Sequence, residues 1–152
     1  MPGEKLGGKK KKDKKKDDGT PFIHTGVYMF PNGDKYEGEY MATEGGSLER
    51  SGRGKHTTAE GTVYDGDWLS DKMNGTGTLQ HPSGARYCGD FVNNQFHGHG
   101  SFTWPNGSFY EGQFVENRLE GEGQFTDTVS QQWTGTFRYK AAPGLRFKLN
   151  MG

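Results

Sequence analysis

The sequence has one cysteine and few aliphatic residues, and these shortages exclude several classes of protein. Because Cys88 is the only cysteine among 152 residues, no disulfide framework can form within the chain, and a reducing compartment is expected. Hydrophobic residues make up only 29% of the chain, against the usual share of roughly 45–50%. A chain this poor in Leu, Ile and Val cannot fill a thick two-layer core.

Long apolar runs are also missing. No stretch of the sequence reaches the roughly 18 apolar residues that a membrane-spanning helix needs, so no such helix is expected. The N-terminus carries charge but lacks the apolar region of a secretory signal. A cytoplasmic location is therefore expected.

Glycine and aromatic residues are abundant instead. The chain has 26 glycines, and aromatic residues make up 13% of it, while glycine ordinarily contributes about 7%. One aromatic side chain buries about 150–250 Å². The composition therefore favours a thin structure in which aromatic rings supply most of the buried surface.

The net charge of zero conceals an asymmetry between the N-terminus and the rest of the chain. Residues 1–18 hold eight Lys and four Asp or Glu, a net charge of +4, whereas residues 19–152 hold eleven Lys or Arg and fifteen Asp or Glu, a net of −4. The composition of the first segment predicts a disordered basic tail over residues 1–20. It is either a solvated solubility tail or an anchor for an acidic protein, an anionic membrane or nucleic acid, with nuclear import a weaker option. The lysines considered for acidic-surface contact are Lys9, Lys10, Lys11, Lys12, Lys14, Lys15 and Lys16.

The remaining sequence is a repeat. An aromatic-x-Gly-x-aromatic motif opens each unit, a Gly-x-Gly follows, and a turn such as "PNG" at 105–107 closes it. The second to fifth units are spaced by 23 residues, and an insertion of five residues within "MATEGGSLERSG" lengthens the first. The fourth unit closes with "TVS" at 128–130, which lacks the glycine, and "GVYMFPNG" at 26–33 is the second half of a unit. The first to fifth units begin at Tyr36, Tyr64, Tyr87, Tyr110 and Trp133.

Each unit predicts a β-hairpin. The turns suit residues with positive φ, and the flanking segments are short and rich in aromatic residues and Thr. The alternation of a strand places Tyr87, Gly89 and Phe91 on one face. Because glycine has no side chain, a ring is expected to lie flat over a neighbouring glycine on that face. The returning strand adds Gly98, Gly100, Phe102 and Trp104 to the same face.

This pattern resembles the MORN (membrane occupation and recognition nexus) repeat family, whose motif is close to Tyr-x-Gly-x-Trp, His-Gly-x-Gly and Asp/Asn-Gly. The match covers about residues 22–137, and the C-terminal part is most similar to the small MORN proteins. The resemblance implies an all-β fold, an elongated single-layer antiparallel sheet of successive β-hairpins that is twisted into a shallow groove. The predicted organisation is a tail over 1–20, the sheet over 21–139 and a C-terminal cap over 140–152.

Catalytic and metal sites are not expected. His97 and His99 share a strand face and resemble half of a metal site, but Asn74 and Glu120 take the place of His97 in neighbouring units. The position of Cys88 varies in the same way, and a flat sheet offers no deep pocket for a nucleophile and its base. The Gly-x-Gly segments lack the further residues of a nucleotide loop. No enzyme activity, metal or cofactor is therefore predicted, and the chain has no room for a catalytic domain beside the repeats.

The aromatic face is the candidate binding surface. A single-layer sheet cannot cover both of its faces, and exposed apolar surface usually marks a binding site. Tyr and Trp are favoured interface anchors, and a helix or an extended segment of a partner would fit a groove of this kind. The alternative is that the inner rings are simply the core. The predicted partner-binding groove consists of Tyr36, Tyr40, Tyr64, Trp68, Tyr87, Phe91, Phe102, Trp104, Tyr110, Phe114, Trp133 and Phe137.

The predicted function is a non-catalytic scaffold that binds a protein partner. MORN proteins recur in cilia, flagella and other cytoskeletal assemblies, so the resemblance implies an axonemal or cytoskeletal location. The alternative is a membrane adaptor that uses the lysine tail on anionic lipid. The net negative charge of the folded part argues against that alternative, and nucleic acid is not an expected partner.

Overall fold

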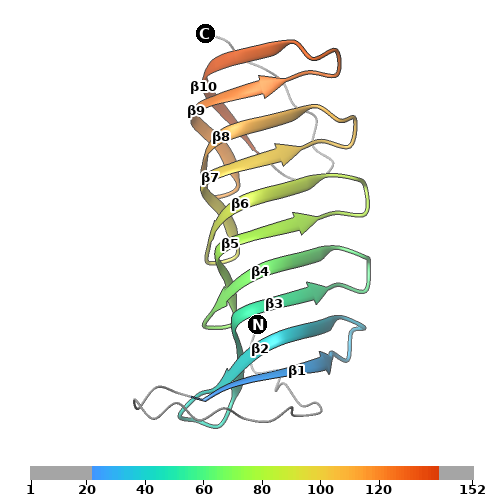
Figure 1. Cartoon of the computed structure of the whole chain (residues 1–152), viewed down its shortest axis with the longest axis vertical. Helices are drawn as coiled ribbons and strands as arrows, with labels where there is room; N and C mark the ends of the chain where they lie inside the picture. Colours follow the sequence, from blue (N-terminus) through green and yellow to red (C-terminus); the bar gives the residue numbers. More distant parts are fainter. Residues whose placement is uncertain (1–21, 141–152) are drawn as a thin grey trace.

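The computed structural model describes residues 22–140, which form one antiparallel sheet (Figure 1). The order of the strands in the sheet follows the chain from β1 to β10, and no helix occurs among the described residues. The predicted all-β, single-layer fold is thus confirmed. The predicted tail with its seven candidate lysines, and the predicted cap beyond residue 140, lie outside the described residues. The strands are β1 (Ile23–Met29), β2 (Lys35–Ala42), β3 (Leu48–Thr57), β4 (Val63–Leu69), β5 (Lys72–Gln80), β6 (Arg86–Val92), β7 (Gln95–Thr103), β8 (Phe109–Val115), β9 (Arg118–Thr126) and β10 (Gln132–Lys140).

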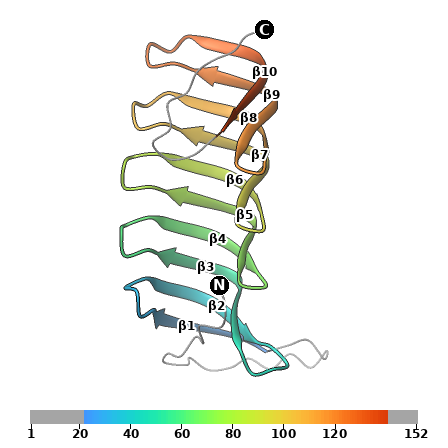
Figure 2. The same ribbon diagram turned by 180° about the vertical axis from the view of Figure 1, so that it is seen from behind.

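Each complete repeat unit is one hairpin, and the hairpins stack along the long axis of the molecule (Figures 1 and 2). The third unit, for example, supplies β6 and β7, and these pair antiparallel with Gly89 opposite Gly100. The insertion of the first unit lies between β2 and β3, where the connection covers residues 43–47. In the second, third and fourth units the connection between the two strands has only two residues, such as Asn93 and Asn94 in the third.

These two-residue turns form one margin of the sheet, which we call the short-turn margin. Both residues of the turn at Asn93 and Asn94 have positive φ, 48° and 69°, as a type I′ turn requires. The second residue links successive units. The Asn94 N–H donates to the carbonyl oxygen of Met73 (3.0 Å), and the Met73 N–H donates to Asn94 Oδ1 (2.9 Å). The same pair of bonds joins Asn117 to Phe96 and Asp71 to Arg50.

The opposite margin, which we call the glycine-turn margin, carries the turns that close each unit. Gly107 of "PNG" has a φ of 91°, and its N–H donates to the carbonyl oxygen of Trp104 (2.9 Å). The fourth unit lacks this glycine, but Ser130 takes the same place with a φ of 64°. The Asp127 carboxylate accepts the N–H groups of Val129 and Gln131 and holds that turn. The missing glycine therefore does not interrupt the fold.

The middle of each hairpin is a crossing of two glycines beneath a tyrosine. A Cβ atom on Gly100 would lie 2.6 Å from Cε2 of Tyr87, so the ring covers this glycine, as predicted. The Tyr87 hydroxyl donates to the carbonyl oxygen of Asp90 (2.7 Å). The register shifts between Gly89 and Phe91, and such a bulge bends the strand. The same ring-on-glycine contact joins Tyr36 to Gly54, Tyr64 to Gly77 and Tyr110 to Gly123.

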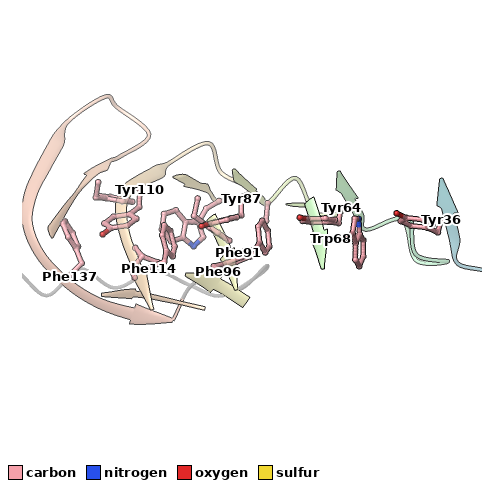
Figure 3. Packing of buried hydrophobic residues seen from close by; sticks show 14 of the residues in the cluster. Tyr36, Tyr64, Trp68, Tyr87, Phe91, Phe96, Tyr110, Phe114 and Phe137 are labelled. Atoms are coloured by element: carbon pink, nitrogen blue, oxygen red, sulfur yellow. The ribbon is translucent and has the colours of Figure 1, made fainter. Parts of the chain in front are cut away.

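The face that carries these rings, here the ring face, holds a continuous aromatic row (Figure 3). Tyr87 packs edge to face against Phe91 of its own hairpin and against Phe114 of the next, with both centroid distances 5.0 Å. Tyr64 bridges Trp68 and Phe91 in the same way. Tyr110 bridges Phe114 and Phe137. Each unit is therefore held by its neighbours, as in other repeat proteins.

Burial of the tyrosines should make stability depend on alkaline pH. Burial raises the pKa of Tyr110 to about 12 and also raises the pKa values of Tyr36, Tyr64 and Tyr87 above the usual value of 10. Because folding raises these pKa values, the stabilising contribution is complete below pH ~10 and decreases as the pH rises toward the folded-state value. We expect the tyrosinate absorbance of these side chains to appear only together with the loss of the β-sheet circular dichroism. Ionisation near pH ~10 without unfolding would contradict the burial.

A cavity on the ring face as the candidate functional site

A cavity of about 570 Å³ lies on the ring face over the first two units. Its lining includes Thr58 and Thr62 from the glycine-turn margin, and Asp71 and Asn94 from the short-turn margin. Residues of both margins therefore border one cavity, which means that the sheet wraps around its ring face. The sheet is therefore bent rather than flat, because a bulge at the middle of each hairpin bends the strands, and the cavity is a half-open hollow on the bent face.

The cavity lies where the units carry smaller side chains. Phe96 and Phe102 of the third unit are buried, 5% and 1% exposed, and fill the ring face there. Met73 and Leu79 occupy the same positions in the second unit and line the cavity. The buried ring of Trp68 lines it too. A difference in side-chain volume between equivalent positions thus opens this part of the ring face.

In the first unit the equivalent positions carry polar side chains. Arg50 takes the place of Phe96 and His56 that of Phe102, while Asp34, two residues before Tyr36, takes the place of Ala85, two residues before Tyr87. These three polar residues are buried, with exposed fractions of only 7–8%. Because a buried charge is costly unless it is paired, the hydrogen-bond partners of these three side chains determine whether they are structural or open to a ligand.

Asp34, His56 and Arg50 form a chain of hydrogen bonds. His56 Nε2 donates to Asp34 Oδ2 (2.9 Å), and Arg50 Nη1 donates to His56 Nδ1 (3.0 Å). Because a guanidinium can only donate, Nδ1 is the acceptor and the imidazole is neutral. Burial by itself raises the pKa of Asp34, but the hydrogen bonds from His56 and from the Ala59 N–H outweigh it and lower that pKa below its usual value.

Arg50 also links the first unit to the second. Its Nε donates to Asp71 Oδ1 (2.6 Å), and its Nη2 donates to the Asp71 carbonyl oxygen (3.2 Å). The guanidinium carbon lies 4.3 Å from the centre of the Trp68 ring, a favourable cation–π arrangement. All three guanidinium nitrogens are thus engaged, so Arg50 forms a wall of the cavity rather than an open anion site.

Replacing Arg50 with Met, the residue at the equivalent position of the second unit, should lower the free energy of unfolding by about 2 kcal/mol. The substitution leaves Asp71 and His56 without their charged partner. Urea denaturation followed by circular dichroism measures the change. Replacing Arg53, whose side chain is 64% exposed and forms an ion pair with the partly exposed carboxylate of Asp67, with Met is the control and should have little effect. Equal losses of unfolding free energy in the two variants would show that the hydrogen bonds of Arg50 with Asp71 and His56 add no more stability than an exposed ion pair does.

The predicted aromatic groove is largely the core of the protein. Trp133 is 37% exposed, and its Nε1 lies 3.4 Å from Asp127 Oδ2. Tyr64 and Trp68 line the cavity. The expectation of an open aromatic surface is thereby corrected, because the bent sheet and the rings of adjacent units cover one another. The predicted groove residues that are buried are Tyr36, Tyr40, Tyr64, Trp68, Tyr87, Phe91, Phe102, Trp104, Tyr110, Phe114 and Phe137.

The candidate metal and catalytic residues lie at the surface. His97 Nδ1 accepts the Glu116 N–H (3.3 Å). His99, which follows Gly98 in β7, is exposed. Cys88 is exposed, with the Thr78 hydroxyl 3.5 Å from its sulfur. Within residues 22–140, no three His, Cys, Asp or Glu side chains come together in an arrangement that could hold a metal ion. The same part of the chain contains no helix long and apolar enough to cross a membrane.

The sequence profile of the MORN repeat matches residues 25–35, 64–86, 87–109 and 110–128, which together make up half of the chain. The chain belongs to the MORN repeat family. MORN repeats are non-enzymatic modules that are generally associated with protein or membrane interaction scaffolds. No curated protein matched the chain significantly, so the expected closer likeness to the small MORN proteins is not supported.

The profile leaves out residues 36–63 of this MORN chain. That segment carries the insertion and two members of the buried polar chain, Arg50 and His56. Sequence analysis did not single out Asp34, Arg50 or His56. The signal was present, however, because alignment of the MORN units places Asp34, Arg50 and His56 at positions where the following repeats carry the apolar residues Ala85, Phe96 and Phe102.

Proposed function

We propose that this MORN protein is a non-catalytic scaffold that holds a segment of a partner protein along its ring face. The observation that carries the proposal is the cavity over the first two units, which lies between the two margins. Its apolar lining comes from Leu48, Met73, Leu79 and the rings of Tyr64 and Trp68. Its volume of about 570 Å³ falls within the usual range of roughly 300–1,000 Å³ for ligand pockets.

The lining favours an amphipathic helix or an extended segment with a large apolar side chain. Such a side chain would pack against Trp68 and Met73, while polar groups of the partner would reach Glu49 and Lys72 at the same cavity. Of the predicted groove, Tyr64 and Trp68 therefore contribute to this contact, and the exposed ring of Trp133 offers a separate one. The other predicted rings support the surface from within the core.

Filling the cavity with residues of the third unit tests this proposal. The double variant Met73→Phe and Leu79→Phe carries the side chains that the fold already accommodates at Phe96 and Phe102. We expect it to fold and to lose at least ten-fold in partner capture, measured by quantitative mass spectrometry of a tagged pull-down from ciliated-cell extract. The matched control is Thr78→Ser with Gln80→Thr. It also replaces residues of the second unit with those of the third, but on the opposite face of the sheet, and it should retain capture of the partner. Undiminished capture by the cavity-filled variant would contradict the proposal.

We also propose that the assembly is ciliary, flagellar or otherwise cytoskeletal, and that the tail lysines contact an acidic protein surface in it. The family likeness and the net charge of +4 over residues 1–18 support these proposals. Residues 1–152 and 19–152 should recover the same axonemal or cytoskeletal proteins, with weaker and less salt-sensitive capture by the shorter form. Recovery of mainly membranes, lost with the tail, would favour the membrane adaptor instead.

A further inference from the structure

The two end strands of the described sheet are opposite halves of a repeat unit. β1 corresponds to the second strand of a unit, because Gly26 pairs with Gly38 just as Gly100 pairs with Gly112. Its sequence agrees, since Phe22 stands in the place of Phe96. Tyr28 and Phe30 likewise take the places of Phe102 and Trp104, and "PNG" follows in both units.

β10 corresponds to the first strand of a unit, with Trp133 and Gly135 in the places of Tyr87 and Gly89. Its surroundings differ from those of a complete unit. Trp133 is 37% exposed, whereas Tyr87 is 0% exposed. A Cβ atom on Gly135 would meet nothing within 4 Å, whereas one on Gly89 would lie 2.5 Å from the backbone of Gly100. Within residues 22–140, the second strand that would cover Trp133 and Gly135 is missing.

We propose that β10 of one copy pairs with β1 of a second copy and completes a repeat unit across the junction. The pairing of β6 with β7 gives the register, because Gly89 lies opposite Gly100 and Cys88 lies opposite Ser101. The junction accordingly pairs Gly135 with Gly26 of the second copy and Thr134 with its Val27. The Trp133 ring then lies over Gly26, as the Tyr87 ring lies over Gly100.

The exposed apolar side chains at the two ends agree with this pairing. Phe22 is 43% exposed at one end and Trp133 is 37% exposed at the other, and both occupy positions that are buried in the third unit. Val27 is 47% exposed, and Thr134 is also exposed. Because the contact joins two different surfaces, it leaves a free end on each copy and builds an open ribbon rather than a closed dimer.

Sedimentation of the full chain over a range of concentrations tests the proposal. We expect the average mass to rise with concentration. Like charges directly opposite each other destabilise a strand pair, so Val27→Lys with Thr134→Lys should weaken association at least five-fold, and Val27→Lys with Thr134→Glu should restore it. Both positions are exposed, so the fold should tolerate all of these changes. A full chain that stays monomeric at every concentration would overturn the proposal, as would undiminished association of the double-lysine variant.

Cross-linking tests the register. In a Cys88→Ser background, a Val27→Cys chain mixed with a Thr134→Cys chain should form a mixed disulfide dimer under mild oxidation, because directly opposite residues have Cβ atoms about 4.5–5.5 Å apart. Ile23→Cys is the control, since it lies on the same face of β1 and is 37% exposed. Equal cross-linking from Ile23→Cys would overturn the proposed register. The measurement involves no other protein, so its outcome is independent of partner binding at the cavity.

Discussion

Replacing Gly77 with alanine is expected to lower the free energy of unfolding by about 3 kcal/mol. The new Cβ atom would lie 2.6 Å from Cε2 of Tyr64. That ring is 3% exposed, and its hydroxyl donates to the carbonyl oxygen of Asp67 (2.7 Å). Trp68 and Phe91 pack against it with centroid distances of 5.0 Å, so the ring has no room to move aside. Urea denaturation followed by circular dichroism measures the loss.

Gly45→Ala is the matched control for this change. Gly45 lies in the long connection of the first unit, and a Cβ atom there would have Thr43 Oγ1 as its nearest neighbour, at 4.0 Å. We expect a change of less than about 0.5 kcal/mol. A similar loss in both variants would show that chain entropy, rather than contact with the Tyr64 ring, determines the cost of replacing Gly77.

Replacing Tyr87 with alanine is expected to cost about 4 kcal/mol. The ring has no exposed surface. It stacks on Phe96 at 4.0 Å and meets Phe91 and Phe114 edge to face at 5.0 Å. Its removal therefore leaves a cavity between the third and fourth units and breaks the aromatic row at the point where the two units meet. Thermal and urea unfolding measure the effect.

Two further variants separate the parts of this effect. Tyr87→Phe keeps the ring but leaves the carbonyl oxygen of Asp90 without its hydroxyl donor, and should cost about 1 kcal/mol. Phe109→Ala removes a ring on the opposite face of the sheet that is 37% exposed, and it should cost less than loss of the buried ring. If Tyr87→Ala is no more destabilising than Tyr87→Phe, the hydrogen bond rather than ring packing holds the units together.

The hairpins, the ring face and the position of the insertion could be predicted because a single motif repeats. The alternation of Tyr87, Gly89 and Phe91 determines which face is buried, and the spacing of the motif determines the register. The turns of the short-turn margin could not be predicted in the same way. Asn93 and Asn94 take positive φ without a glycine, and the bonds that hold Asn94 come from Met73 in the preceding unit.

The site was predicted only in part, for two physical reasons. The strand pattern indicates which rings share a face, but it does not show that bulges bend the sheet until rings such as Tyr87 are covered. The cavity depends on the volumes of Met73 and Leu79 relative to Phe96 and Phe102. This difference in side-chain volume is recognised as the cause of a cavity only when the two units are superposed in space.

The first unit also shows how this architecture accepts new sequence. Gly38 still pairs with Gly54, and Tyr40 still pairs with Arg50, although the insertion lies between the two members of the second pair. Because the strands are aligned at their middle, the length of the connection beyond that point does not alter the alignment. The turns at 70–71, 93–94 and 116–117 lie on the same margin. Peptides grafted into them would project as a row of loops from a rigid backbone, with the spacing set by the hairpins beneath.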